Sequence, residues 1–298
     1  MFAVATVLDP PASRQREGQI LVALAALAWS SAGLLQRRLD LDIATQVAGR
    51  AIFAAIALAL FVAVTERGRV IRATRSIGLA GVGFAVCVAL ASGAFIAALN
   101  HTSVARVLFI QAISPVLASL LAWAALREPI SLRTAVALAT ALAGVALMLG
   151  APGAGDLTGD LMALLMATAF AVALVISRHR KDVSMAPATF LSQLMLIAVF
   201  LPFAAVGDVP GGDLPELAAM GAGQIGLGLA LLTVGARLIP AAQVALITLL
   251  EVVLGPLWVW LAYAERPETA TLAGGAVVIV AIVIQTSGGT GAAPVPPP

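Results

Sequence analysis

Charged side chains are scarce in this chain of 298 residues, where they make up 11% of the total. Soluble globular domains carry roughly 25% charged residues. Because 61% of the residues are hydrophobic, the few charges cannot cover a water-exposed surface of this size. A soluble globular protein is therefore excluded, and the surplus apolar surface is expected to face lipid.

Cysteine and lysine are nearly absent as well. Cys87 is the single cysteine, so no disulfide can form within the chain, and no Cys/His spacing typical of a metal site occurs. Lys181 is the single lysine, and no basic patch with interleaved aromatic residues points to nucleic acid. No cofactor, metal ion or nucleic-acid partner is therefore expected.

Long apolar runs dominate what is present. A helix needs about 20 apolar residues to cross the hydrocarbon core of a bilayer, and the sequence supplies ten such runs. They span approximately residues 19–35, 43–64, 77–99, 104–126, 132–150, 159–177, 187–206, 216–236, 241–262 and 269–286. These runs are apolar on every face and too long for membrane β-strands. The predicted fold class is all-α, a polytopic membrane protein with ten transmembrane helices.

Arginine and lysine gather on alternate linkers between the runs. Twelve basic residues flank the side that holds the N-terminus, and four flank the other side. The first group is Arg14, Arg16, Arg67, Arg69, Arg72, Arg75, Arg127, Arg133, Arg178, Arg180, Lys181 and Arg237, and the second is Arg37, Arg38, Arg106 and Arg266. Because cytoplasmic loops carry the excess of basic residues, both termini are predicted to be cytoplasmic, in a multi-pass protein of the bacterial inner membrane.

The two halves of the chain are similar to each other. The segment 114–128 aligns with 251–265 at an offset of 137 residues, and 18–37 aligns with 159–178 at an offset of 141. The alignment sets Trp29 opposite Phe170. Because each half holds five helices, the second half must enter the membrane from the opposite side, as inverted repeats do. The expected domains are a cytoplasmic tail (1–18), a first repeat (19–150), a second repeat (159–286) and a disordered tail (287–298).

Four polar residues lie near the middle of the fourth and ninth runs. Gln111 and Ser114 are three residues apart, as are Thr248 and Glu251, and the two pairs are equivalent at the offset of 137. Polar residues at membrane depth usually face the bundle interior or a water-filled cavity. The repeat axis is therefore expected to bring the two pairs to one central site.

Glu251 is the only acidic residue within a predicted span. It fits three roles: proton coupling, binding of a substrate amine, or a neutral carboxyl group that hydrogen-bonds another helix. Trp29 and Phe95 are candidates to line the cavity, or to act as lipid-facing anchors. Pro115 and Pro256 lie within the fourth and ninth runs, where they predict hinges or static kinks.

Two arginines lie toward the outer ends of their runs. Arg50 is expected to reach the outer interface with its side chain or to pair with an acid. Arg106 is expected to be an interfacial arginine, with attraction of a carboxylate as the alternative. Gly221 to Gly226 matches the dinucleotide fingerprint letter by letter, but it lies inside an apolar helix without a preceding strand, so nucleotide binding is not expected.

The Ser-Pro-Val, Ala-Trp and Arg-Glu pattern of 114–128, whose second copy at 251–265 begins with Glu251 and keeps the Trp and the final Glu, resembles the EamA repeat of the drug/metabolite transporter superfamily. The resemblance covers about residues 19–286 and implies a central cavity in which the fourth and ninth helices are prominent. Within the superfamily the chain is similar to bacterial amino-acid exporters, above all to those of aromatic amino acids. Ser114 replaces the acid in the first copy, which argues against coupling by two symmetric carboxylates.

The function expected from these observations is that of a secondary exporter of small metabolites, with aromatic amino acids as the first guess. Its partners are then a small-molecule substrate and membrane lipid, and a monomer is the simplest state. An intramembrane enzyme is disfavoured because only Glu251 offers a titratable group at depth. A translocator of lipids or nucleotide sugars is the alternative, disfavoured because no basic residue is expected near the midplane.

Overall fold

The computed structural model describes residues 12–36, 39, 41–67, 70–102, 104–149, 156–205, 207, 209–264 and 267–287, most of which are helical and none of which forms a strand. The helices are α1 (Ala12–Trp29), α2 (Ala32–Gln36), α3 (Ile43–Thr65), α4 (Val70–Ser76), α5 (Gly78–His101), α6 (Val104–Gln111), α7 (Ser114–Leu126), α8 (Leu132–Leu149), α9 (Leu157–His179), α10 (Ala186–Phe200), η1 (Leu201–Phe203), α11 (Leu214–Ala218), η3 (Ala219–Gly226), α12 (Leu227–Gly235), α13 (Ala241–Thr248), α14 (Leu250–Tyr263) and α15 (Thr269–Thr286).

The ten predicted spans correspond to these helices, singly or in consecutive groups. Among the described residues, eight helical stretches are long and apolar enough to cross a membrane, and a shorter apolar helix covers Leu132–Met148. The first span differs from the prediction, because α1 begins at Ala12, inside the segment expected to be a tail. The Arg, Gln and Glu residues before Gly18 are good helix formers, so the helix continues beyond the apolar run. Residues 1–11 and 288–298 of the predicted tails lie outside the described part.

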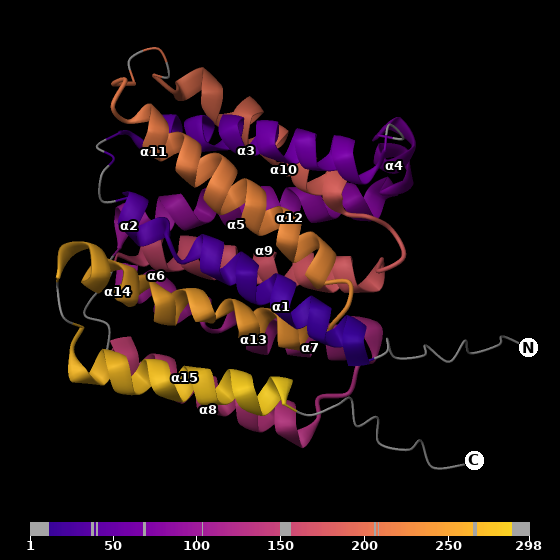
Figure 1. The fold of residues 1–298 in the computed structure, drawn as a ribbon, viewed down its shortest axis with the longest axis vertical. Coiled ribbons are helices and arrows are strands. Elements are labelled where there is room, and N and C mark those ends of the chain that lie inside the picture. Colours follow the sequence, from indigo (N-terminus) through magenta and orange to yellow (C-terminus); the bar gives the residue numbers. More distant parts are fainter. Residues whose placement is uncertain are drawn as a thin grey trace, which may run out of the picture.

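The two repeats run in opposite senses. Gly18 near the start of α1 lies beside Leu238, and Arg237 donates a hydrogen bond to the carbonyl of Lys181 just after α9. Thus α1 begins where α9 ends. In the following text, the terminus face is the end of the molecule where α1 begins and α15 ends, and the distal face is the opposite end (Figure 1).

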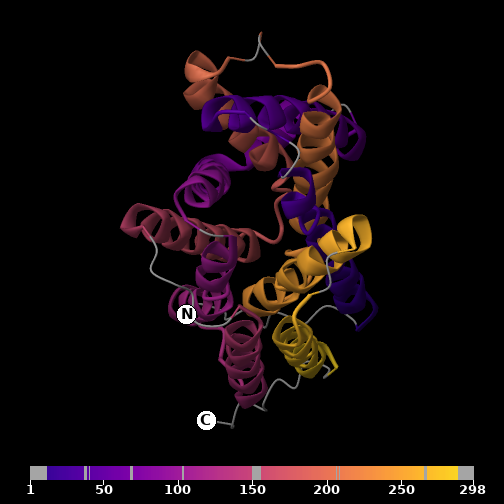
Figure 2. The ribbon, with the colours of Figure 1, turned by 90° about the vertical axis from the view of Figure 1, so that its left-hand side faces the viewer.

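Helices from the two repeats pack against each other in pairs that the two-fold axis relates. The contact of α1 with α12 is equivalent to the contact of α9 with α5. The helices α3 and α10, and likewise α8 and α15, are equivalent to each other and pack together. The α8–α15 pair forms one edge of the molecule and the α3–α10 pair the opposite edge (Figures 1 and 2). Arg127 and Ala264, which end α7 and α14, both adopt the left-handed conformation, with φ of 56° in each. These two residues are 137 positions apart, so the symmetry extends to the backbone.

Glycines allow the closest helix contacts. A Cβ on Gly274 of α15 would lie 2.4 Å from the carbonyl oxygen of Gly144 on α8. A Cβ on Gly221 of η3 would lie 2.4 Å from the carbonyl oxygen of Arg50 on α3. Such small residues let helix backbones approach each other in a lipid environment, where hydrophobic drive between helices is weak.

Candidate functional site: a central cavity between the repeats

A cavity lies between helices of both repeats. It comprises about 850 Å³ of space between the helices, part of which is open to solvent. Its wall is mostly apolar and includes Trp29, Phe84, Phe95, Met166, Phe170 and Leu232. The polar side chains that reach it are Arg50, Ser92, Gln111, Gln224 and Glu251.

Trp29 and Phe170 mark the axis that relates the repeats. The ring centroids are 5.9 Å apart and the ring planes meet at 75°, an edge-to-face contact. Aromatic rings favour this geometry over stacking face to face. The sequence alignment had set these two residues opposite each other, and both line the cavity. The cavity therefore lies on the pseudo-two-fold axis.

Gln111 and Glu251 meet across the same axis. The Gln111 side-chain amide donates a hydrogen bond to the Glu251 carboxyl oxygen Oε1. Gln111 is the last residue of α6, and Glu251 is the second residue of α14. The contact thus joins the fourth span to the ninth, one from each repeat. Both side chains line the cavity.

Each of these two spans is broken near its middle. The fourth span is interrupted at Ala112 and Ile113, and the ninth at Leu249, which is equivalent to Ala112 at the offset of 137. Pro115 follows the first break as the second residue of α7, where its missing N–H is not needed. Pro256 lies inside α14, away from the break. Among the described residues, only Pro115 of the two predicted hinge prolines therefore adjoins a break.

Ser114 and Thr248 do not line the cavity, although they were expected beside Gln111 and Glu251. Ser114 is 3% exposed, and its hydroxyl is buried with no partner among the described residues. Thr248 is 4% exposed and donates a hydrogen bond to the Ala245 carbonyl oxygen at 2.8 Å. In a continuous helix, residues three positions apart lie on the same face. The break falls between the two members of each pair, so Ser114 and Thr248 no longer face the same way as Gln111 and Glu251.

Arg50 lies in the cavity wall, not at the outer interface. Its side chain is 2% exposed, and Nη2 donates hydrogen bonds to the Ser92 carbonyl oxygen at 2.9 Å and to Ser92 Oγ at 2.8 Å. No ion pair with an acid occurs among the described residues. The expectation that Arg50 would extend to the interface or pair with an acid was wrong, because α5 covers this part of α3 and supplies Ser92.

Gln224 is a second cavity residue that sequence reasoning missed. It lies in the π-helical segment η3, in the Gly221 to Gly226 stretch that resembles a dinucleotide motif. Its amide nitrogen donates to the Trp29 carbonyl oxygen at 3.2 Å, and its Oε1 is buried without a partner among the described residues. π-Helical segments are frequent at functional sites. An amide in an otherwise apolar span was the signal that could have found it.

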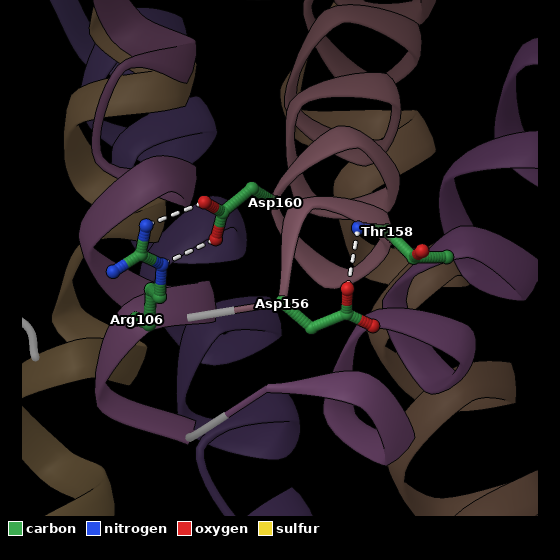
Figure 3. A network of polar contacts seen from close by, with 4 residues as sticks. All are labelled: Arg106, Asp156, Thr158 and Asp160. Atoms are coloured by element: carbon green, nitrogen blue, oxygen red, sulfur yellow. Dashed lines mark hydrogen bonds and ion pairs between the residues drawn. The ribbon is translucent and has the colours of Figure 1, made fainter. Parts of the chain in front are cut away.

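Arg106 is engaged at the distal face, away from the cavity. Its guanidinium pairs with the carboxylate of Asp160, which connects α6 of the first repeat to α9 of the second (Figure 3). The nearby Asp156 caps α9 by accepting a hydrogen bond from the Thr158 N–H at 3.2 Å. The carboxylate that Arg106 attracts is thus one of the protein's own.

A second polar network connects the repeats at the terminus face. Arg178 Nε donates to Glu128 Oε1 at 2.8 Å, and Arg178 Nη1 donates to the Arg237 carbonyl oxygen at 3.5 Å. Arg237 Nε donates in turn to the Lys181 carbonyl oxygen at 2.5 Å. Burial lowers the pKa of the Arg237 guanidinium from its ordinary value. Glu128 belongs to the first repeat and the other three residues to the second, so the network joins the two repeats at this end of the bundle.

Comparison with known proteins identifies the family. The EamA-like transporter family matches residues 16–150 and again residues 157–287. The chain belongs to the EamA-like transporter family. It is a multi-pass membrane transporter of small solutes built from two EamA repeats.

Solved structures support the same fold. Among 29 matching chains, one crystal structure superposes with a TM-score of 0.78 over 91% of this chain and 97% of its own, at 19% sequence identity. At this identity the likeness establishes the fold alone. No curated protein matches the sequence.

Proposed function

We propose that the protein is a secondary exporter of small metabolites, with amino acids as substrates and aromatic amino acids as the first candidates. The observation that supports it most directly is the contact of Gln111 with Glu251, made by two broken spans over a cavity on the repeat axis. Substrate sites of inverted-repeat transporters lie at such repeat interfaces, beside discontinuous helices. Trp29 and Phe95 offer aromatic walls for an aromatic side chain.

The transport cycle we propose is alternating access by rocking of the repeats, taken as residues 19–150 and 159–286. The terminus face is assigned to the cytoplasm of a bacterial cell, because the basic residues gather there. The Arg178 network joins the repeats at that face, and we propose that it keeps the cytoplasmic side closed. Pro115, beside a break, is the proposed hinge, and Pro256 is assigned to a static part of its helix.

Glu251 is the proposed coupling residue. It is the one acidic residue among those that line the cavity in the described part of the chain, and a carboxyl group at this depth can carry a proton or hold a substrate ammonium. In proteoliposomes, Glu251→Gln is expected to abolish the pH dependence of labelled phenylalanine and tryptophan transport. Glu17→Gln, at an exposed position of α1, is the matched control. An unchanged rate and pH profile of the Glu251 variant would eliminate the coupling role.

The alternative is a translocator of lipids or nucleotide sugars, and Arg50 is the observation in its favour. The cavity does contain a basic residue, contrary to the sequence-based expectation. However, a cavity with one guanidinium and one carboxyl group matches a zwitterion or a monoanion better than a diphosphate, which needs several positive charges. Counterflow with labelled nucleotide sugars in the same proteoliposomes would separate the two functions.

A further inference from the structure

Arg50 is a buried cation with unused hydrogen-bonding capacity. Only its Nη2 donates hydrogen bonds, both to Ser92, so Nε and Nη1 have no partner within the described part of the chain. Burying a guanidinium is costly unless an anion compensates for the lost hydration. A hydroxyl and a carbonyl oxygen are neutral acceptors, so they compensate for only part of that cost.

We propose that Arg50 binds the carboxylate of the transported molecule, so that substrates of this protein combine a carboxylate with an apolar side chain. This inference rests on the proposed transport function and assigns the chemistry of the same cavity. A guanidinium presents two parallel N–H groups that match the two oxygens of a carboxylate.

Carboxylate is favoured over phosphate by the charge of the cavity. Arg50 is the only basic residue among those that line the described cavity, and Glu251 shares that cavity. One positive charge suits one negative charge. The apolar part of the ligand is then accommodated by the predominantly apolar wall, in which Phe84 and Phe95 are aromatic.

The backbone that carries Arg50 is held in place. Gly221 of η3 packs directly against the Arg50 carbonyl oxygen, and α3 also packs against α10. Ser92 orients the guanidinium from the side of α5. An anchor fixed in this way loses little entropy on binding. Arg50 and Glu251 are carried by different helices, α3 and α14, one from each repeat.

Three probes that share a phenyl ring test the proposal: labelled 3-phenylpropanoate, phenethylamine and phenylalanine. Binding is measured on the full chain in lipid nanodiscs by scintillation proximity. Arg50→Gln is expected to weaken binding of 3-phenylpropanoate by roughly 10- to 100-fold, the effect of losing a charge-assisted bidentate contact. Affinity for phenethylamine should stay within about twofold, and Arg50→Lys should recover part of the loss. Arg106→Gln, at the distal arginine that pairs with Asp160, is the matched control.

The outcomes separate this inference from the transport assignment. A wild-type protein that binds 3-phenylpropanoate but not phenylalanine would refute amino-acid specificity and leave the Arg50 site standing. Equal weakening of all probes by Arg50→Gln would mean that Arg50 only maintains the shape of the cavity, and would overturn the proposal. Unchanged affinity for 3-phenylpropanoate, or a wild-type protein that binds only phenethylamine, would also overturn it. A wild-type protein that binds none of the probes contradicts both.

Discussion

The ion pair of Arg178 with Glu128 is expected to set the balance between states closed and open at the terminus face. The side chains are 11% and 29% exposed, so the pair is partly shielded from water. A charge-assisted hydrogen bond contributes about 1.5–3 kcal/mol, and the exposure of Glu128 favours the lower limit. Arg178→Gln should therefore shift the equilibrium by about 1.5 kcal/mol, or roughly tenfold, toward the state open at this face.

Thiol labelling can measure that shift. Leu232 lines the cavity and is 3% exposed, so a cysteine introduced there in a Cys87→Ser background is protected while the terminus face is closed. The labelling rate from that side should rise about tenfold in the Arg178→Gln protein, in proportion to the open population. Arg180→Gln, a neighbouring change outside the network, should not alter it.

Exchange of the two charges provides the decisive control. Arg178→Glu alone places two acids together and should increase labelling further. Combined with Glu128→Arg it should restore much of the protection, because the pair is re-formed in reverse. If Arg178→Gln leaves the labelling rate unchanged, or the exchanged pair restores nothing, the ion pair does not close this face and the reasoning fails.

Three further predictions concern packing and capping. Gly274→Ala should destabilise the protein by about 1–3 kcal/mol through overpacking, because its Cβ would lie 2.4 Å from the backbone of α8; an unchanged Tm would contradict this. Asp42→Ala should cost about 1 kcal/mol by removing the cap of α3. Hydrogen bonds from the side chain and backbone N–H of Thr45 lower the pKa of Asp42 in the folded protein. The stabilisation of the fold by ionised Asp42 is therefore fully present above the pKa of Asp42 in the unfolded chain, and it is lost as the pH falls through the lowered pKa of the folded state. Thermal scans at several pH values should show this loss in the wild type only. Gly228→Ala should displace the Trp29 indole, since its Cβ would lie 2.2 Å from Nε1; unchanged tryptophan fluorescence would count against that contact.

Composition and the repeat were sufficient to predict the membrane architecture. The length of an apolar run and the distribution of charge are local properties, so they can be read without knowing which helices touch. The opposition of Trp29 and Phe170 followed from the alignment, and the structure brings the rings into contact. The contact of Gln111 with Glu251 likewise joins the two spans that the alignment made equivalent.

The wall of the cavity was harder to predict, for two physical reasons. A helix break is a tertiary feature, and the breaks at Ala112 and Leu249 removed Ser114 and Thr248 from the cavity. Arg50 was placed at the interface because long basic side chains generally extend toward water. In the structure, Ser92 on the neighbouring helix α5 binds the Arg50 side chain instead. The sequence of α3 alone does not indicate which residues of other helices lie beside it.

The equivalent breaks in the fourth and ninth spans have one more consequence. The helix is interrupted at Ala112 and again at Leu249, with a proline three residues later in the first span only, so the interruption does not require proline. The packing of the surrounding helices is then what stabilises it. Mutational scans for mobile points in such transporters should therefore sample the neighbours of a helix break as well as the break itself.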